Sequence, residues 1–272
     1  MQLQLKIWET SQLIAHEFLN NIGQWLKIAF LPWVLGTWSI ISVEQFFANN
    51  FPTDPIPWWL EVVVLAPFSA MIFVTILKNL MYDAPVRFLG LDLSQSTLLA
   101  TLVMAILGLT SLFTDYLFIQ CLLLAGPDFF SEEAPYYIPP DSVRYLSLSI
   151  VRWIVDAAII AASYMVFAAI VEHNQLRFRQ IFALVRRHFW GLLGIVILFS
   201  VAIRGFEHLY FGTFQLFNVD IGELRPTTAT RPAALSSAKS MVIWFPVDFL
   251  SSVLPPIGIG IIYRAYKKHG LI

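Results

Sequence analysis

Several charged side chains lie inside long apolar stretches of this sequence, and those that could carry its chemistry are Asp115, Arg152, Asp156, Arg204 and Asp248. On insertion scales a charge at the centre of a bilayer costs roughly 2.5–3.5 kcal/mol, so each of these side chains needs a partner. Counted from the ends of the stretches at about 1.5 Å per helical residue, they reach comparable depths in the outer halves of four helices. The sequence therefore predicts a polar pocket that opens to the outer side and binds a ligand or a partner.

The same residues also admit a purely structural interpretation. Arg152 and Asp156 are four residues apart and can pair on one face of a helix. Arg204 can extend its guanidinium toward the membrane surface, and Asp248 can cap a kink beside Pro246. The sequence alone leaves both interpretations open.

The usual catalytic and metal-binding patterns each lack a residue that their mechanism needs. His16-Glu17 begins like the helix of a zinc protease, but Asn20 stands where the second histidine ligand would be. The sequence contains no Gly-x-Ser-x-Gly elbow and no phosphate-binding Gly-Lys loop. We therefore predict no catalytic residue, no metal site and no cofactor, and we favour a protein that is not an enzyme.

The composition indicates a membrane protein. Of the 272 residues, 58% are hydrophobic and only 13% are charged, whereas about 25% of the residues of a soluble domain are charged. The net charge of −1 gives no reason to expect a nucleic-acid partner. The single cysteine, Cys121, excludes an intramolecular disulfide framework.

Six stretches are long and apolar enough to cross a bilayer, which takes about 20 residues of helix. They cover residues 25–46, 58–77, 98–124, 150–171, 189–211 and 241–263. Helices are expected because an open sheet in lipid would leave backbone groups unpaired. The sequence thus predicts an all-α integral membrane protein, a single polytopic domain over residues 1–272 with a bundle of about six transmembrane helices.

The positive residues predict the orientation of these spans, because Lys and Arg collect on the cytoplasmic side. With a cytoplasmic N-terminus, 11 of the 17 positive residues fall inside: Lys6, Lys27, Lys78, Arg87, Arg177, Arg179, Arg186, Arg187, Arg264, Lys267 and Lys268. The outer loops are acidic instead. We therefore expect a multi-pass protein of the cell's inner membrane with both termini in the cytoplasm.

Two amphipathic segments, residues 7–22 and 173–188, are too short to cross and are predicted to lie on the membrane surface. In the second, anionic lipid headgroups would contact four arginines: Arg177, Arg179, Arg186 and Arg187. The alternative is that this segment extends the fourth or fifth span into the cytoplasm. The outer loop 212–240 is rich in Thr, Ala, Pro and Ser and is expected to be mobile.

The stretch 178–194 runs from a basic amphipathic segment directly into an apolar span through Phe189 and Trp190. This junction resembles one found in bacterial multi-pass families, the YciC-type inner-membrane proteins and the membrane domain attached to some glycerophosphodiester phosphodiesterases. The resemblance implies a bacterial inner-membrane protein. It brings no catalytic or binding residues with it.

Three classes of function fit these features. The first is a non-enzymatic subunit of a membrane complex, or a factor that assembles or maintains such a complex or the envelope. The second is a permease or lipid-handling protein that uses the outer pocket, and the third is an enzyme with a carboxylate pair such as Asp115 and Asp248. We favour the first, with membrane lipids and other membrane subunits as partners, because the inner half is apolar where a transporter shows polar groups near the midplane.

The fourth span also contains two pairs of small residues that let helices approach closely, Ala157 with Ala161 and Ala158 with Ala162. Packing inside the bundle is favoured for these pairs. A contact with a second copy of the chain is the alternative.

The orientation is testable with reporter fusions. A reporter fused after residue 130 or residue 225 should lie outside the cell, and one fused to the C-terminus should lie inside, because the positive residues hold the inner loops in the cytoplasm. An external C-terminus would contradict the predicted topology.

Overall fold

The computed structural model describes residues 7–51, 57–83, 91–124, 143–175, 178–216 and 238–268. These residues form helices and no strand, which confirms the predicted all-α membrane bundle. The helices are α1 (Ile7–Asn20), α2 (Ile22–Asn50), α3 (Trp58–Tyr82), α4 (Gln95–Leu124), α5 (Val143–His173), α6 (Phe178–Leu216) and α8 (Ala238–Lys268).

Six of these helices are long and apolar enough to cross a membrane, so the chain is a multi-pass membrane protein. The candidate spans are Ile22–Phe47, Trp59–Tyr82, Gln95–Cys121, Ser149–His173, His188–Thr213 and Ile243–Lys268. Each overlaps one predicted stretch. The second and sixth run further than predicted, because the helices continue through polar residues that lie beyond the apolar run.

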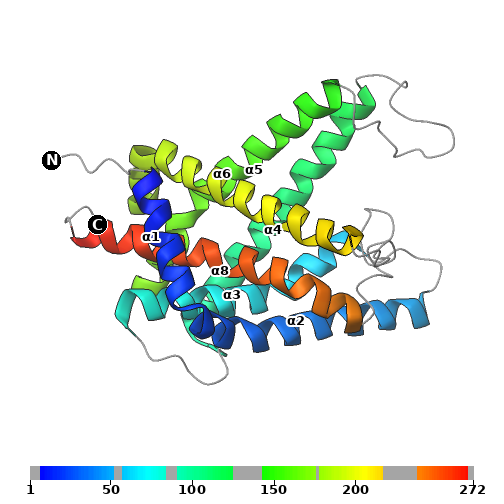
Figure 1. Cartoon of the computed structure of the whole chain (residues 1–272), viewed down its shortest axis with the longest axis horizontal. Helices are drawn as coiled ribbons and strands as arrows, with labels where there is room; N and C mark the ends of the chain where they lie inside the picture. Colours follow the sequence, from blue (N-terminus) through cyan, green and yellow to red (C-terminus); the bar gives the residue numbers. More distant parts are fainter. Residues whose placement is uncertain are drawn as a thin grey trace.

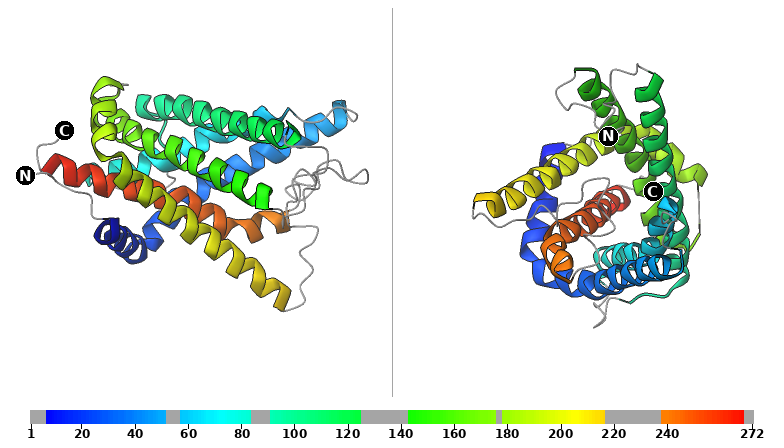
Figure 2. Two further views of the ribbon diagram at one scale, coloured as in Figure 1. Left: turned by 90° about the horizontal axis from the view of Figure 1, so that it is seen from above. Right: turned by 90° about the vertical axis from the view of Figure 1, so that its right-hand side faces the viewer.

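Helix α1 and the C-terminal end of α8 lie at the same end of the bundle, here called the proximal end (Figure 1). In the view along the bundle, α8 lies inside the ring that the other spans form (Figure 2). At the opposite, distal end, α6 diverges from the pair α4 and α5 in all the views (Figures 1 and 2). The predicted outer half of the protein corresponds to this distal half.

The hydrophobic core lies in the proximal half. Residues 164–171 of α5 are all buried, and so are residues 256–260 of α8. Further along α5, toward the distal end, the side chain of Val151 is 57% exposed and its neighbours Ile154 and Val155 are exposed as well. The bundle is therefore closed proximally. Distally, α4 and α5 diverge from α6 (Figure 2), while α6 and α8 still pack against each other through Phe211, Trp244 and Val247.

Close helix contacts hold α8 in the centre. A Cβ atom at Gly258 would lie 2.9 Å from Cε2 of Phe199 in α6, and one at Gly260 would lie 2.8 Å from Cδ1 of Leu80 in α3. Small residues let membrane helices pack this closely. Although α8 contains three prolines, including Pro246, it is one unbroken helix, because packing against neighbouring helices makes proline tolerable at membrane depth.

Some predicted boundaries need correction. The segment 178–188 is not a separate surface helix: it begins α6 and continues into the span without a break, as in the alternative of an extended span. Of the predicted mobile loop 212–240, residues 212–216 belong to α6 and residues 238–240 to α8. The rest of that loop lies outside the described residues.

The small residues of α5 pack mainly inside the bundle. Ala157 and Ala161 are buried, as favoured from the sequence. Ala158 is half-buried and Ala162 is exposed. Only one of the two small-residue pairs is therefore enclosed by this chain.

Packing around α8 predicts opposite effects for two glycine substitutions. Gly260→Ala should destabilise the protein by about 1–3 kcal/mol, because the new methyl group would overlap Leu80 of α3. Gly205→Ala should be neutral or stabilising, because a Cβ there meets nothing within 4 Å and alanine favours the helix. Thermal unfolding in detergent measures both, and equal effects would contradict the close packing of α8.

Candidate functional site

Three of the five predicted site residues form one ionic cluster, the Asp115–Arg152–Asp156 triad, between α4 and α5. The guanidinium of Arg152 pairs with Asp115 of α4 and lies 3.8 Å, from Nε to Oδ2, from Asp156 on its own helix. Thr114 Oγ1 donates a hydrogen bond of 2.9 Å to Asp156, and Arg152 also lies 5.4 Å from the ring centroid of Phe118. The triad thus joins the distal halves of two helices.

The triad lies at membrane depth and is only partly covered. Asp115 and Asp156 lie about 10 Å inside the distal ends of their spans, at 1.5 Å per residue. The side chains of Arg152, Asp115 and Asp156 are 37%, 33% and 21% exposed. With two carboxylates and one guanidinium, the triad has a formal charge of −1, which the surrounding hydrocarbon cannot solvate.

The other two predicted residues have partners elsewhere. Arg204 pairs with Glu207 on its own helix at 2.7 Å and is 72% exposed. Asp248 Oδ2 accepts a hydrogen bond of 3.2 Å from the indole N–H of Trp33, which connects α8 to α2. The expected single pocket is therefore divided among three places, because α6 diverges distally from α4 and α5 (Figure 2).

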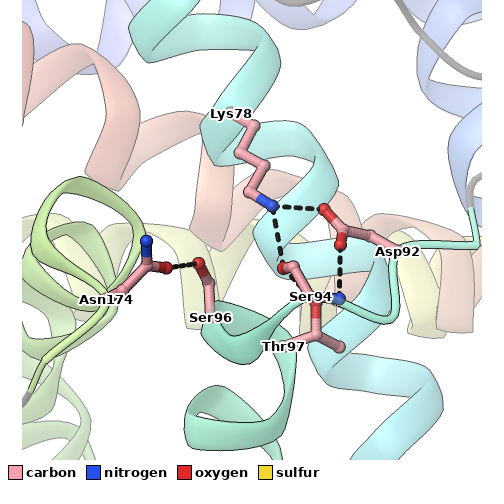
Figure 3. A network of polar contacts seen from close by, with 6 residues as sticks. All are labelled: Lys78, Asp92, Ser94, Ser96, Thr97 and Asn174. Atoms are coloured by element: carbon pink, nitrogen blue, oxygen red, sulfur yellow. Dashed lines mark hydrogen bonds and ion pairs between the residues drawn. The ribbon is translucent and has the colours of Figure 1, made fainter.

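A second polar cluster, at the proximal end, joins α3, the start of α4 and the end of α5 (Figure 3). Lys78 Nζ lies 2.6 Å from Asp92 and donates to Ser94 Oγ at 2.8 Å. The backbone N–H of Ser94 donates to Asp92 at 2.8 Å. Ser96, which is buried, donates to the Asn174 side chain, so the cluster fastens the chain entering α4 to both neighbouring helices.

Asp92 is the charged acceptor of this proximal cluster. Partial burial raises the pKa of its carboxyl group, but the hydrogen bonds from Lys78 and Ser94 outweigh burial and hold the pKa below its usual value. Asp92 and Lys78 therefore form a true ion pair at neutral pH.

The proximal ends of α3, α5 and α8 are also connected by charge. Glu172 accepts hydrogen bonds from the hydroxyl of Tyr263 and from Lys267 Nζ, the latter at 2.7 Å. Arg264 pairs with Asp83 at 2.9 Å. Arg264 and Lys267, two of the positive residues that predict the topology, thus also connect helices at the proximal end.

Sequence reasoning missed the partners that come from other helices. Trp33 and Asp248 are 215 residues apart, and no spacing pattern relates them. Thr114 could have been found, because it precedes Asp115 in an otherwise apolar stretch and offers a hydroxyl at nearly the same depth.

Of the four arginines predicted to contact lipid headgroups, three lie in described helix. Arg186 is exposed on α6. Arg179 and Arg187 also lie in α6, and Arg177 lies outside the described residues. Within the described part of the chain, no group of three or more His, Cys, Asp or Glu side chains could hold a metal ion.

Comparison of the chain with protein-family models, with curated proteins and with solved structures finds no match. The resemblance of residues 178–194 to YciC-type proteins therefore stays a prediction. The geometry of the described residues is the basis on which a function can be proposed.

The contacts of the triad predict coupling between two substitutions. Arg152→Gln and Asp115→Asn should each destabilise the protein, by an amount between the value of about 1 kcal/mol for an exposed pair and about 3–5 kcal/mol for a buried one. Together they should cost less than their sum, by more than about 0.5 kcal/mol, because they remove the same interaction. Thermal unfolding in detergent measures this coupling.

The matched control is Arg204→Gln combined with Asp248→Asn. These two residues have separate partners, so their effects should add within about 0.5 kcal/mol. Additive effects of Arg152→Gln and Asp115→Asn would contradict the triad.

Proposed function

We propose that this protein is a non-enzymatic subunit of a bacterial inner-membrane complex, or a factor that assembles or maintains such a complex or the envelope. Both termini would lie in the cytoplasm, so that the distal half is the outer half. The observation that carries the proposal is the partly exposed, charged triad on the distal halves of α4 and α5.

An exposed charge at this depth favours contact with protein over contact with lipid tails. Lipid tails offer no hydrogen bonds, whereas a polar side chain on another transmembrane helix can pair with Asp115 or Asp156. Exposed apolar residues lie one helical turn from the triad on the same sides of its helices, including Ile119 of α4 and Ile160 of α5. A polar group with an apolar surround is the pattern expected of a surface that another membrane helix covers.

The alternative is a lipid-handling protein, and the open distal half supports it. A permease is less favoured, because a path across the membrane would also have to pass the proximal half. There the core is dense: Ile170 of α5, Ile195 of α6 and Ile259 of α8 are completely buried.

The contact with lipids that we infer at the proximal end involves α1. Ile14 and Phe18 of α1 are buried against the bundle, while Trp8 and Leu19 are exposed on an adjacent face and His16 on the remaining one. Such a helix fits a position in the plane of the membrane surface, with one face on protein, one on lipid and one on water.

Photo-crosslinking in intact membranes tests the proposal. A photoreactive residue at Ile160, one helical turn from Asp156 on the same side of α5 and exposed, should give an adduct with another protein chain. The same residue at Leu35 of α2, which is 38% exposed against 40% for Ile160, should give lipid adducts alone. The adduct from position 160 should weaken when Arg152→Gln is added, because the triad would then lack its guanidinium.

Native mass spectrometry after mild extraction separates the alternatives. A stable assembly of protein chains agrees with the proposed function. A monomer that holds a phospholipid, together with lipid adducts alone at position 160, would overturn it in favour of lipid handling.

A further inference from the structure

We propose that the partner at the distal half is a second copy of this chain, whose Arg204 pairs with the Asp115–Arg152–Asp156 triad. This inference rests on the proposed function, because it names the partner of the same site. Two surfaces of one molecule carry complementary charges at the same depth but are held apart, and a second copy can bring them together.

The acceptor surface is the triad. Arg152 is shared between two carboxylates: it pairs with Asp115, and its Nε lies 3.8 Å from Asp156, which is longer than a hydrogen bond. Asp156 therefore has room for a second cationic partner. Helix α4 already contributes Thr114 and Asp115 to the triad. A second cationic partner for Asp156 must therefore come from outside α4 and α5.

The donor surface is the distal half of α6. Arg204 has five N–H donors, and Nη1 bonds to Glu207 while the side chain stays 72% exposed. Arg204 lies about 13 Å inside the distal end of its span, and Asp156 about 10 Å inside its own. The two residues are thus within one helical turn of each other in depth.

The fold keeps these surfaces apart within one chain. Helix α6 diverges distally from α4 and α5, as both views of Figure 2 show. Two copies related by a two-fold axis along the bundle would form the contact twice, because each copy supplies one triad and one Arg204. In each contact, Arg204 of one copy would lie beside Asp156 of the other. Guanidinium and carboxylate groups would then alternate from the triad of one copy to the Arg204–Glu207 pair of the other.

Small residues on the donor surface permit the approach. On α6, Gly205 is exposed, and a Cβ there would meet nothing within 4 Å; the same holds for a Cβ at Gly212, seven residues further on. Close backbone approach at such residues is how transmembrane helices associate, whereas lipid tails do not require it.

Charge exchange between two tagged copies tests the proposal. Two copies with different affinity tags are produced together, extracted into nanodiscs, and purified through one tag while the other is quantified. Wild-type copies should co-purify. Asp156→Arg in both copies, or Arg204→Asp in both, should lower the recovered second tag at least about tenfold, because each contact then joins like charges.

The decisive combination pairs one Asp156→Arg copy with one Arg204→Asp copy. In this mixed dimer one contact is reversed and the other is native, so both are again complementary and co-purification should return. The restored signal also demonstrates that both variants fold. Co-purification that is unchanged by the single reversals, or that the combination does not restore, would overturn the proposal.

A steric pair of variants serves as an independent check. Gly205→Leu should abolish co-purification and leave a folded monomer, because its position is open in the single chain. Gly23→Leu is the matched control, since a Cβ at Gly23 also meets nothing within 4 Å but lies near the proximal start of α2. Equal effects of the two substitutions would contradict a contact at α6.

The two proposals fail differently. If the chain is monomeric but position 160 still crosslinks to another protein, the second-copy inference is wrong and the proposed function stands. If position 160 crosslinks to lipid alone, both are wrong.

Discussion

Hydrocarbon solvates no charge, and this constraint determines where this protein can be polar. A charged side chain at membrane depth is stable only when another group supplies the hydrogen bonds that water would supply. At the proximal end the constraint is met within the chain, where Lys78 pairs with Asp92 and Lys267 with Glu172. In the distal half it is met only in part, because Asp115, Arg152 and Asp156 share one positive charge among them.

The contrast between the two ends is a result of how the helices pack. In the proximal half α8 is enclosed, with Gly258 against Phe199 and Gly260 against Leu80. Such short contacts fix the axes of α3, α6 and α8 relative to each other. Long, straight helices that cross at an angle must separate away from their closest contact, so tight proximal packing is itself a reason for the distal opening seen in Figure 1.

Much of the fold could be predicted from sequence, because hydrophobic length is a local property. Six apolar stretches predict six spans, and only the ends moved. The site was harder to predict from sequence. Arg152 and Asp156 are close in sequence, but whether Arg204 and Asp248 join them depends on how the helices that carry these residues pack. The packing of α6 includes contacts with distant parts of the chain, such as Gly194 against Ile7 of α1, which no periodicity reveals. The Trp33 partner of Asp248 could not be predicted for the same reason.

The short helix α1 covers only the proximal part of one face of α6. On α6, Gly194, Val201 and Gly205 lie along this face, since seven residues make nearly two helical turns and eleven make just over three. Ile7 of α1 covers this face at Gly194, where a Cβ would lie 2.6 Å from its Cδ1 atom. Helix α1 runs across the bundle at the proximal end and not along α6 (Figure 1), so it leaves Gly205 uncovered. Among the described residues this face is thus covered at Gly194 and open at Gly205, next to Arg204, which is the arrangement that the proposed contact with a second copy requires.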